Sequence, residues 1–220
     1  MVIVLTNKEG NLFFFEYLYV IIETQVTTVA WKGRYVMPAV VELSKERIVK
    51  VAVKIVNDKG WESVNARSLA KALGVSTKPL YRIYNNMDEI KEDIYKEISH
   101  QYDEFITSRI DSKKALLTLC IAYVEFAQEY KNLFISLFLS NNLKWKSIEN
   151  VLDEKWNQGA IINLVNKHGL SFEQAKNLFM NLWLYANGLA TLIATNEITI
   201  DKNEILVKLV KLYKALTKGE

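Results

Sequence analysis

Hydrophobic and polar residues alternate along most of the chain with the period of an α-helix. From Ser44 to about Asp58, and in successive windows to the end of the chain, apolar residues recur every three or four positions. This spacing gives each helix one apolar face to bury and one polar face for solvent. Two prolines and eight glycines in 220 residues leave few interruptions. The pattern therefore predicts an all-α fold.

Polar residues at regular spacing indicate where successive helices begin. Three pairs have the spacing of a capping box, in which two side chains satisfy free N–H groups at a helix start: Asn86 with Glu89, Ser171 with Gln174, and Asp201 with Glu204. We expect further helices to begin at Ser112, at Asn132, and at Ser147 or Asn150, the last of these reaching His168. No linker separates these helices, so a domain boundary near residue 90 would run through a shared helix.

The stretch RSLAKALGVSTKPLYRIYNNMDEIK, residues 67–91, has the pattern of two short helices joined by a tight turn. Gly74 can adopt the left-handed conformation that ends the first helix. Ser76 is then a candidate N-cap for the second. Pro79 would be the third residue of that helix, where no intrahelical N–H is needed. The pattern predicts a helix-turn-helix whose second helix runs from Ser76 through Tyr84.

The longer segment ERIVKVAVKIVNDKGWESVNARSLAKALGVSTKPLYRIYNNMDEIKEDIYKEI, residues 46–98, resembles the DNA-binding domain of the TetR (tetracycline-repressor-like) family of transcriptional regulators in order and spacing. The resemblance implies a double-stranded DNA operator as partner, with the second helix of the motif in the major groove. Two positions depart from the family pattern. Ile83 stands where many members carry a phosphate-contacting His or Tyr, and Met87 stands where many carry Lys.

Outward-facing residues of the predicted second helix are the candidates for DNA contact. We expect Lys78 and Arg82 to supply charge and Tyr81 a hydroxyl. The full predicted set is Arg67, Ser76, Thr77, Lys78, Pro79, Tyr81, Arg82 and Tyr84. The whole chain carries a net charge of only +3, but residues 44–84 carry a net charge of +6. That local excess attracts phosphates, although a basic run on a helix is commonly just a solvated face.

Aromatic residues are frequent beyond the DNA-binding segment and suit an apolar small-molecule pocket. The residues we predict to bind a ligand are Phe134, Trp156, Trp183 and Asn187. Each aromatic residue taken alone is more commonly plain core, and an Asn on an apolar helix can simply bond to the backbone. Together they favour an apolar or aromatic effector whose identity the sequence does not specify.

The last two predicted helices are apolar on more than one face. Both FEQAKNLFMNLWLYANGLATLIAT and ILVKLVKLYKALTK carry broad hydrophobic stripes. The resemblance places them where family members form a four-helix interface between two subunits, so we expect a homodimer. Burial in the protein's own core is the alternative. The run LWLYANGLATLIA also resembles the Trp-His-Gly signature of one C-terminal subgroup, with Asn187 in the His position.

Few residues are arranged for catalysis or metal binding. The single cysteine, Cys120, allows no intrachain disulfide and fits a reducing cytoplasm. His100 and His168 lie far apart in the sequence, and no glycine-rich phosphate loop or nucleophile elbow is present. We therefore expect no catalytic site, metal or cofactor, and no membrane segment.

The N-terminal residues precede the helical pattern and allow more than one interpretation. We divide the chain into an extension (1–40), a helix-turn-helix domain (41–90) and a helical effector-binding and dimerisation domain (91–220). The apolar run at 12–22 is shorter than a membrane span and contains Glu16. One interpretation is a strand pair, because residues 26–29 are β-formers, or an added arm that lies on the helices. The other is translation from Met37, because the codons of residues 31–33 contain a purine run resembling a ribosome-binding site.

These observations favour a homodimeric, ligand-responsive transcription factor, most simply a repressor. A DNA-binding regulator controlled by a protein partner is the second interpretation. An enzyme that reuses a helical scaffold is the third.

Overall fold

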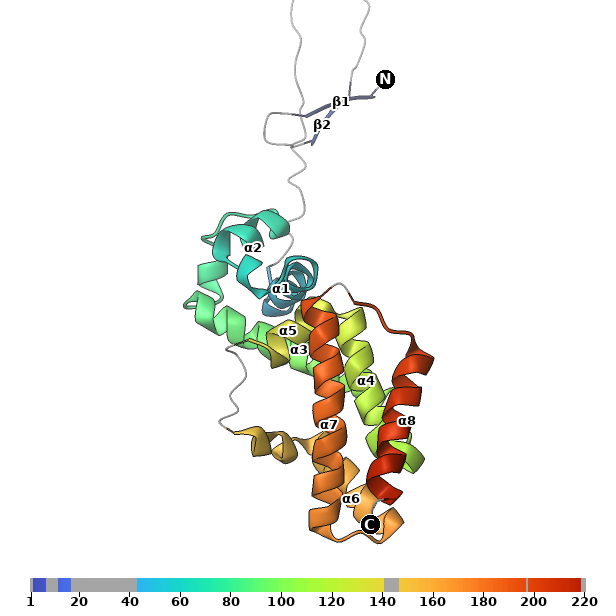
Figure 1. Cartoon of the computed structure of the whole chain (residues 1–220). Coiled ribbons are helices and arrows are strands. Elements are labelled where there is room, and N and C mark those ends of the chain that lie inside the picture. Colours follow the sequence, from blue (N-terminus) through green and yellow to red (C-terminus); the bar gives the residue numbers. More distant parts are fainter. Residues whose placement is uncertain (1, 7–11, 17–42, 141–146, 197, 219–220) are drawn as a thin grey trace, which may run out of the picture. The chain divides into compact units, whose positions relative to one another are not determined.

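The computed structural model describes residues 2–6, 12–16, 43–140, 147–196 and 198–218, and the chain divides into two compact units, residues 1–43 and 44–220 (Figure 1). In the first unit β1 (Val2–Thr6) and β2 (Leu12–Glu16) form an antiparallel pair in which Val4 lies opposite Phe14. Our sequence analysis allowed a strand pair in this extension but placed no strand at residues 2–6. The predicted strand at 26–29 and the alternative start at Met37 lie outside the described residues.

Residues 44–220 confirm the predicted all-α fold in their described part. The first half contains α1 (Lys45–Lys59), the short 3-10 helix η1 (Trp61–Ser63), α2 (Ala66–Leu73) and the 3-10 helix η2 (Leu80–Arg82). The Ser44 hydroxyl caps α1 by accepting a hydrogen bond from the N–H of Arg47. Gly74 ends α2 with φ of +70°, a left-handed conformation that favours glycine, as predicted.

The second helix of the motif is much shorter than predicted. We expected a helix from Ser76 through Tyr84, but only residues 80–82 form one, a single turn of 3-10 helix. Pro79 has no N–H to donate, and the N–H groups of Leu80 and Arg82 bond three residues back, to Thr77 and Pro79. The N-cap position of this turn is Pro79 and not the predicted Ser76.

The remaining helices build the C-terminal part of this unit (Figure 1). They are α3 (Met87–Thr107), η3 (Ser112–Lys114), α4 (Ala115–Glu129), α5 (Lys131–Phe138), η4 (Ile148–Asp153), α6 (Lys155–His168), α7 (Phe172–Thr195) and α8 (Lys202–Lys218). The predicted helix from residue 147 or 150 to His168 is divided at Glu154, whose extended backbone has ψ of 134°.

The capping predictions are confirmed at Ser171 and changed in detail elsewhere. Ser171 and Gln174 form a complete capping box at the start of α7. Asn86 caps α3, but the Glu89 carboxylate accepts from Asn85 instead of the Asn86 N–H. Asp201 accepts from the N–H of Asn203 at the start of α8.

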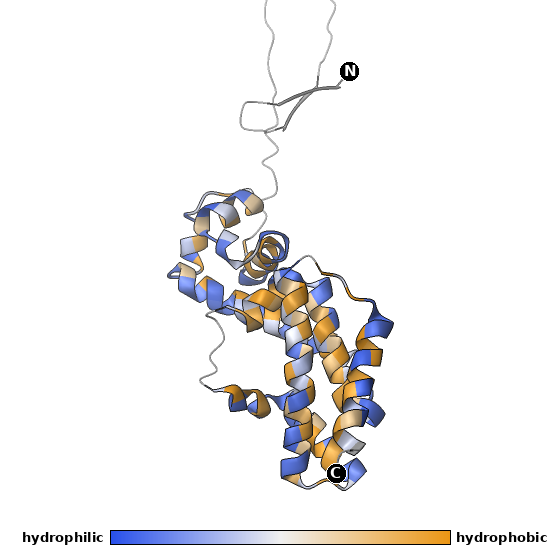
Figure 2. Cartoon of the chain, viewed as in Figure 1, coloured by the Kyte–Doolittle hydropathy of each residue, from blue (hydrophilic) through white to orange (hydrophobic). Residues whose placement is uncertain are grey.

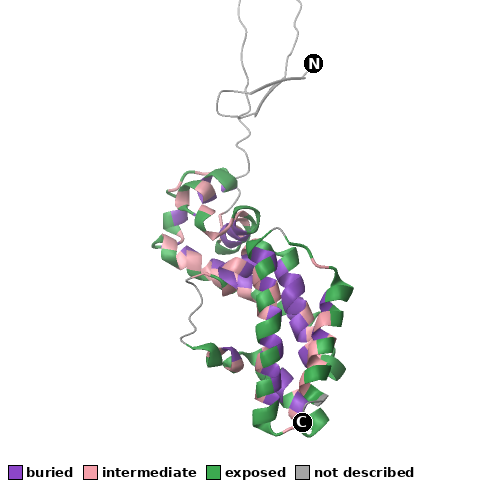
Figure 3. Ribbon diagram, in the orientation of Figure 1, coloured by how far each residue is buried: buried purple, intermediate pink, exposed green. Residues whose placement is uncertain are grey.

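Buried side chains form a core that continues through α3. Ile90, Ile94 and Ile98 repeat every four residues along α3 and are fully buried. Figure 2 shows the hydrophobic residues gathered on α4, α5 and α7, and Figure 3 shows that the buried positions follow the same helices. Because α3 begins directly after the helix-turn-helix and packs against α1, α4 and α5, it joins the two halves of the unit.

Helix α7 is the helix among the described residues that is long and apolar enough to cross a membrane. Nearly half of its apolar window (44%) is buried inside the fold. It packs against α4, α6 and α8. A core helix of a bundle meets the same length and hydropathy criteria.

Candidate nucleic-acid interface and ligand cavity

The short segment between α2 and α3 presents several predicted DNA-contacting residues to solvent. Lys78, Tyr81 and Arg82 are exposed, Tyr81 to 46%, and so are Arg67 and Ser76. Thr77 and Pro79 are half-buried. A hydroxyl and two cations are the groups that bind phosphate oxygens and base edges.

Two apolar anchors hold this segment against the helices beneath it. Leu80 is fully buried and Tyr84 is 2% exposed. The Tyr84 hydroxyl donates a hydrogen bond to Asp93 Oδ2 on α3 at 3.0 Å. Burial and this hydrogen bond raise the pKa of Tyr84. The buried ring of Tyr84 positions the segment and its hydroxyl is bonded to Asp93, so the DNA contact that we predicted for Tyr84 stays a prediction that this geometry does not favour.

Lys45 is a candidate contact that the sequence analysis did not select. It is exposed, and its Nζ lies 4.6 Å from the centroid of the Tyr84 ring, so it stands beside the short segment. The local basic excess included Lys45, but the distance in sequence from Tyr84 gave no reason to pair them. The fold brings the first turn of α1 beside Tyr84, at the end of the short segment between α2 and α3, which we call the recognition segment.

A cavity of about 360 Å³ lies among α3, α4, α5, α6 and α7. Its lining residues are Tyr95, Ser99, Tyr102, Asp103, Leu119, Cys120, Tyr123, Leu137, Phe138, Glu154, Trp156, Asn157 and Trp183. A more open hollow of about 690 Å³ runs along the outer face of α3 and shares Tyr95, Ser99 and Asp103 with it. These volumes are of the size that holds small organic ligands.

Two of the four predicted ligand-binding residues line this cavity and two do not. Trp156 and Trp183 are in the lining. Phe134 is fully buried behind it, with its ring centroid 5.2 Å from that of Tyr123. Asn187 accepts a hydrogen bond from the Tyr123 hydroxyl at 3.0 Å, so it orients a lining residue without lining the cavity itself.

The polar groups of the cavity come mainly from α3 and from the break before α6. The Trp156 indole N–H donates to Asp103 Oδ1 at 2.9 Å, which ties α6 to α3. Burial raises the pKa values of Tyr102 and Tyr123 above the ordinary tyrosine value. Burial also raises the pKa of the Cys120 thiol to about 12.

Sequence reasoning missed the contribution of α3 to the cavity. Ser99 follows Tyr95 by four residues, and Tyr102 and Asp103 follow Ser99 by three and four, so all four lie on one side of the helix. This mixed aromatic and polar face was the available signal. The prediction selected residues of the later helices instead, because aromatic residues are frequent there.

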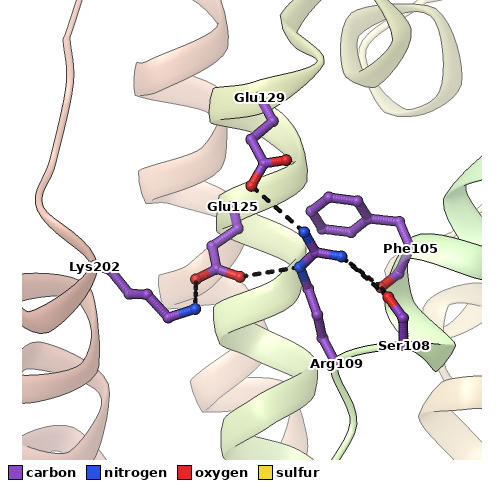
Figure 4. Close-up of polar contacts among 6 residues, drawn as sticks. All are labelled: Phe105, Ser108, Arg109, Glu125, Glu129 and Lys202. Atoms are coloured by element: carbon purple, nitrogen blue, oxygen red, sulfur yellow. Dashed lines mark hydrogen bonds and ion pairs between the residues drawn. The ribbon is translucent and has the colours of Figure 1, made fainter.

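A charged network connects the end of α3 to α4 and α8 (Figure 4). The Glu125 carboxylate, 11% exposed, lies 3.4 Å from Arg109 Nε and 2.6 Å from Lys202 Nζ. Arg109 also approaches Glu129 at 3.6 Å, and its guanidinium lies 3.5 Å from the centroid of the Phe105 ring. Glu125 therefore links the turn that follows α3 with the first residue of α8.

A second contact connects the C-terminal helices to the first helix. The Asn132 side-chain amide on α5 donates to the main-chain carbonyl of Asn57 on α1 at 2.8 Å. α5 also contributes to the cavity through Leu137 and Phe138. The cavity and the helix-turn-helix therefore share both α3 and α5 as supports.

Comparison with known proteins identifies the fold. No family model matches the chain. It is 23% identical over 176 residues, 77% of this chain and 79% of the relative, to an uncharacterised HTH-type transcriptional regulator of Mycobacterium tuberculosis. A TetR-family regulator of Streptomyces coelicolor superposes with a TM-score of 0.58 at 16% identity, covering 79% of this chain and 80% of that one. A TetR-like regulator of Rhodococcus sp. RHA1 superposes with a TM-score of 0.57 at 14% identity, covering 84% of this chain and 100% of that one. The chain therefore has the fold of the TetR-family transcriptional regulators.

Proposed function

We propose that the chain is a TetR-family transcriptional regulator, a repressor that binds double-stranded DNA as a homodimer and releases it when a small molecule occupies the cavity. The observation that carries the proposal is the short segment at residues 76–82, where Lys78, Tyr81 and Arg82 are exposed above the buried Leu80. Two cations and a hydroxyl on a turn that is anchored to the buried core can contact phosphates and base edges in a major groove.

Exposed apolar side chains on the last two helices support dimerisation. Leu184 and Leu192 are eight residues apart on one face of α7, and both are exposed. Leu206 and Val207 are exposed on α8, which packs beside α7. Burial in the chain's own core, the alternative to a dimer, leaves these side chains in solvent. A second copy would cover them.

Helices α3 and α5 contact both the cavity and the helix-turn-helix, so a change at the cavity can alter the position of the DNA-binding segment. A dimer reads two half-sites about 34–36 Å apart, so a small rotation of the two α3 helices changes the fit to DNA. A ligand that binds more tightly to a dimer with the wrong spacing favours release of the DNA. Bound DNA lowers the affinity for the ligand by the same factor. The cavity favours this mechanism over control by a protein partner, which remains the second candidate.

Salt-dependent gel-shift titration tests the DNA-binding proposal, with an operator selected from a random DNA pool. Arg82→Ala and Lys78→Ala should each weaken operator binding by about 1–3 kcal/mol if they read bases, and should weaken all DNA equally if they contact phosphate. Lys114→Ala is the matched control, an exposed lysine in η3. Unchanged DNA affinity in both recognition-segment variants would contradict the proposal.

A further inference from the structure

The cavity lining changes from polar at its mouth to apolar inside. Tyr95, Ser99 and Asp103 also line the open hollow beside α3, so they mark the mouth. The carboxylates of Asp103 and Glu154 are exposed and therefore stay in contact with solvent. Five lining residues are 8% exposed or less and form what we call the inner wall: Leu119, Cys120, Tyr123, Leu137 and Trp183. A ligand against the inner wall meets no carboxylate, lysine, arginine or histidine of that wall.

The hydroxyl of Tyr102 is an unused donor in this cavity. Tyr123 and Asn157 both donate within the protein, Tyr123 to Asn187 at 3.0 Å and Asn157 to the carbonyl of Val151 at 2.7 Å. The Tyr102 hydroxyl has no hydrogen-bond partner among the described residues. No described side chain holds a sealed oxygen without a partner, so this oxygen is in contact with open space. Because Tyr102 lines the cavity and not the hollow, that space is the cavity.

Three aromatic rings hold Tyr102 in place. The centroid of its ring lies 5.0 Å from that of Phe138, 5.1 Å from that of Phe126 and 6.4 Å from that of Tyr123, all in edge contacts. A tyrosine hydroxyl carries its proton at neutral pH, and burial raises the pKa of Tyr102 further. Tyr102 is therefore a positioned, uncharged donor.

We propose that the cavity binds an uncharged aromatic compound with a carbonyl oxygen, which accepts a hydrogen bond from the Tyr102 hydroxyl. This inference rests on the proposed function, because it names the chemical class of the effector. A carbonyl oxygen accepts without donating, so it needs no second partner from the inner wall. The aromatic body packs against the rings of Tyr123 and Trp183. An anion would lose its water without gaining a cationic partner, and the exposed carboxylates at the mouth would repel it.

Probes of matched shape test the selection. We would measure binding to the full chain, without DNA, by equilibrium dialysis. The probes are 2-acetylnaphthalene, 2-isopropenylnaphthalene, in which a CH₂ group replaces the carbonyl oxygen, and the anion 2-naphthoate. The ketone should bind about three- to tenfold more tightly than the alkene, the effect of one neutral hydrogen bond. The carboxylate should bind at least about tenfold more weakly than the ketone. Equal affinities for the ketone and the alkene, or no binding of the ketone, would overturn the proposal.

Hydroxyl-removing variants locate the donor. Tyr102→Phe should weaken ketone binding by about three- to tenfold and leave alkene binding unchanged. Its urea midpoint should stay at the wild-type value, because the lost hydroxyl has no partner in the protein. Tyr130→Phe is the matched control, since it removes a hydroxyl outside the cavity lining. Tyr95→Phe removes one at the mouth, where water competes, and should keep the preference for the ketone. A preference that persists in Tyr102→Phe would overturn the proposal.

Operator binding by the same preparations separates this inference from the proposed function. Ketone-selective binding by a protein that fails to bind DNA would overturn the regulator proposal and keep the carbonyl site. DNA binding without a preference for the ketone would overturn the carbonyl site alone.

Discussion

The recognition segment and the ligand cavity both rest on α3, yet they are held in different ways. The segment at residues 76–82 depends on two anchors, Leu80 within it and Tyr84 just after it, and the Tyr84 hydroxyl donates a hydrogen bond to Asp93. The cavity draws side chains from α3 to α7, which span almost ninety residues of sequence as counted from Tyr95 to Trp183. A single substitution should therefore disable the segment more easily than the cavity.

Removing Leu80, the fully buried anchor, should have the largest effect on stability and on operator binding. Leu80→Ala removes a fully buried side chain from beneath the recognition segment. We expect it to lower the free energy of unfolding by about 2–5 kcal/mol and to abolish operator binding. Urea unfolding and gel-shift titration measure the two effects. If the variant still binds a small molecule in the cavity at low temperature, the contrast between the two regions holds. Loss of both operator binding and small-molecule binding in a folded variant would contradict it.

The charged network tests whether the C-terminal helices behave as one body. Glu125→Ala removes the carboxylate that lies between Arg109 and Lys202. We expect a loss of about 1–3 kcal/mol in the free energy of unfolding, reduced from the value for a fully buried pair because both cations are partly exposed. Urea unfolding measures it. Glu129→Ala is the matched control and should cost less than about 0.5 kcal/mol, since that side chain is half exposed.

Tyr84→Phe separates the hydrogen bond of the second anchor from its ring. The ring stays buried, but the bond to Asp93 Oδ2 is lost. We expect about 1 kcal/mol of destabilisation and a modest loss of operator affinity. The wild-type stability should also fall above about pH 10, because the folded pKa is raised and only the unfolded chain ionises there. An unchanged alkaline stability profile in Tyr84→Phe would contradict this assignment.

The smallest effect concerns the cap of α3. The Glu89 carboxylate accepts hydrogen bonds from the Asn85 side chain and main chain, and these bonds lower the pKa of Glu89. Because the folded pKa lies below the unfolded one, the contribution is present above about pH 4.5 and is lost as the pH falls through the folded value. Urea unfolding from pH 3 to 7 should show a shallower acid slope for Glu89→Gln. Parallel profiles would exclude the linkage.

Local signals in the sequence carried the prediction of most helix boundaries. Gly74, Asn86 and Ser171 act through neighbours within four residues, so their patterns could be interpreted without the fold. The all-α architecture followed from periodicity for the same reason. The prediction was wrong around Pro79. A proline is allowed in the first turn of an α-helix, but the N–H groups of Leu80 and Arg82 bond three residues back and form a 3-10 turn beside the buried Leu80 and Tyr84.

The cavity could be predicted only in part, because its geometry depends on contacts between distant residues. Trp156 and Trp183 were selected for their size and position, while Phe134 and Asn187 fitted the same criteria and lie behind the wall. The sequence shows Asp103 only as one member of a mixed aromatic and polar face of α3, and its hydrogen bond with the Trp156 indole, 53 residues later, has no local signal. The break at Glu154 was likewise predicted as continuous helix.

The burial of Cys120 has a consequence for the chemistry of the intact protein. It is the single cysteine of the chain and lines the cavity, 1% exposed, with a thiol pKa raised to about 12. Alkylating agents and peroxides attack the thiolate, which is scarce at neutral pH when the pKa is so high. The folded protein should therefore resist iodoacetamide and should form no disulfide-linked dimers in air. Rapid labelling would begin only when unfolding exposes the thiol, which makes Cys120 a built-in reporter of opening around the cavity.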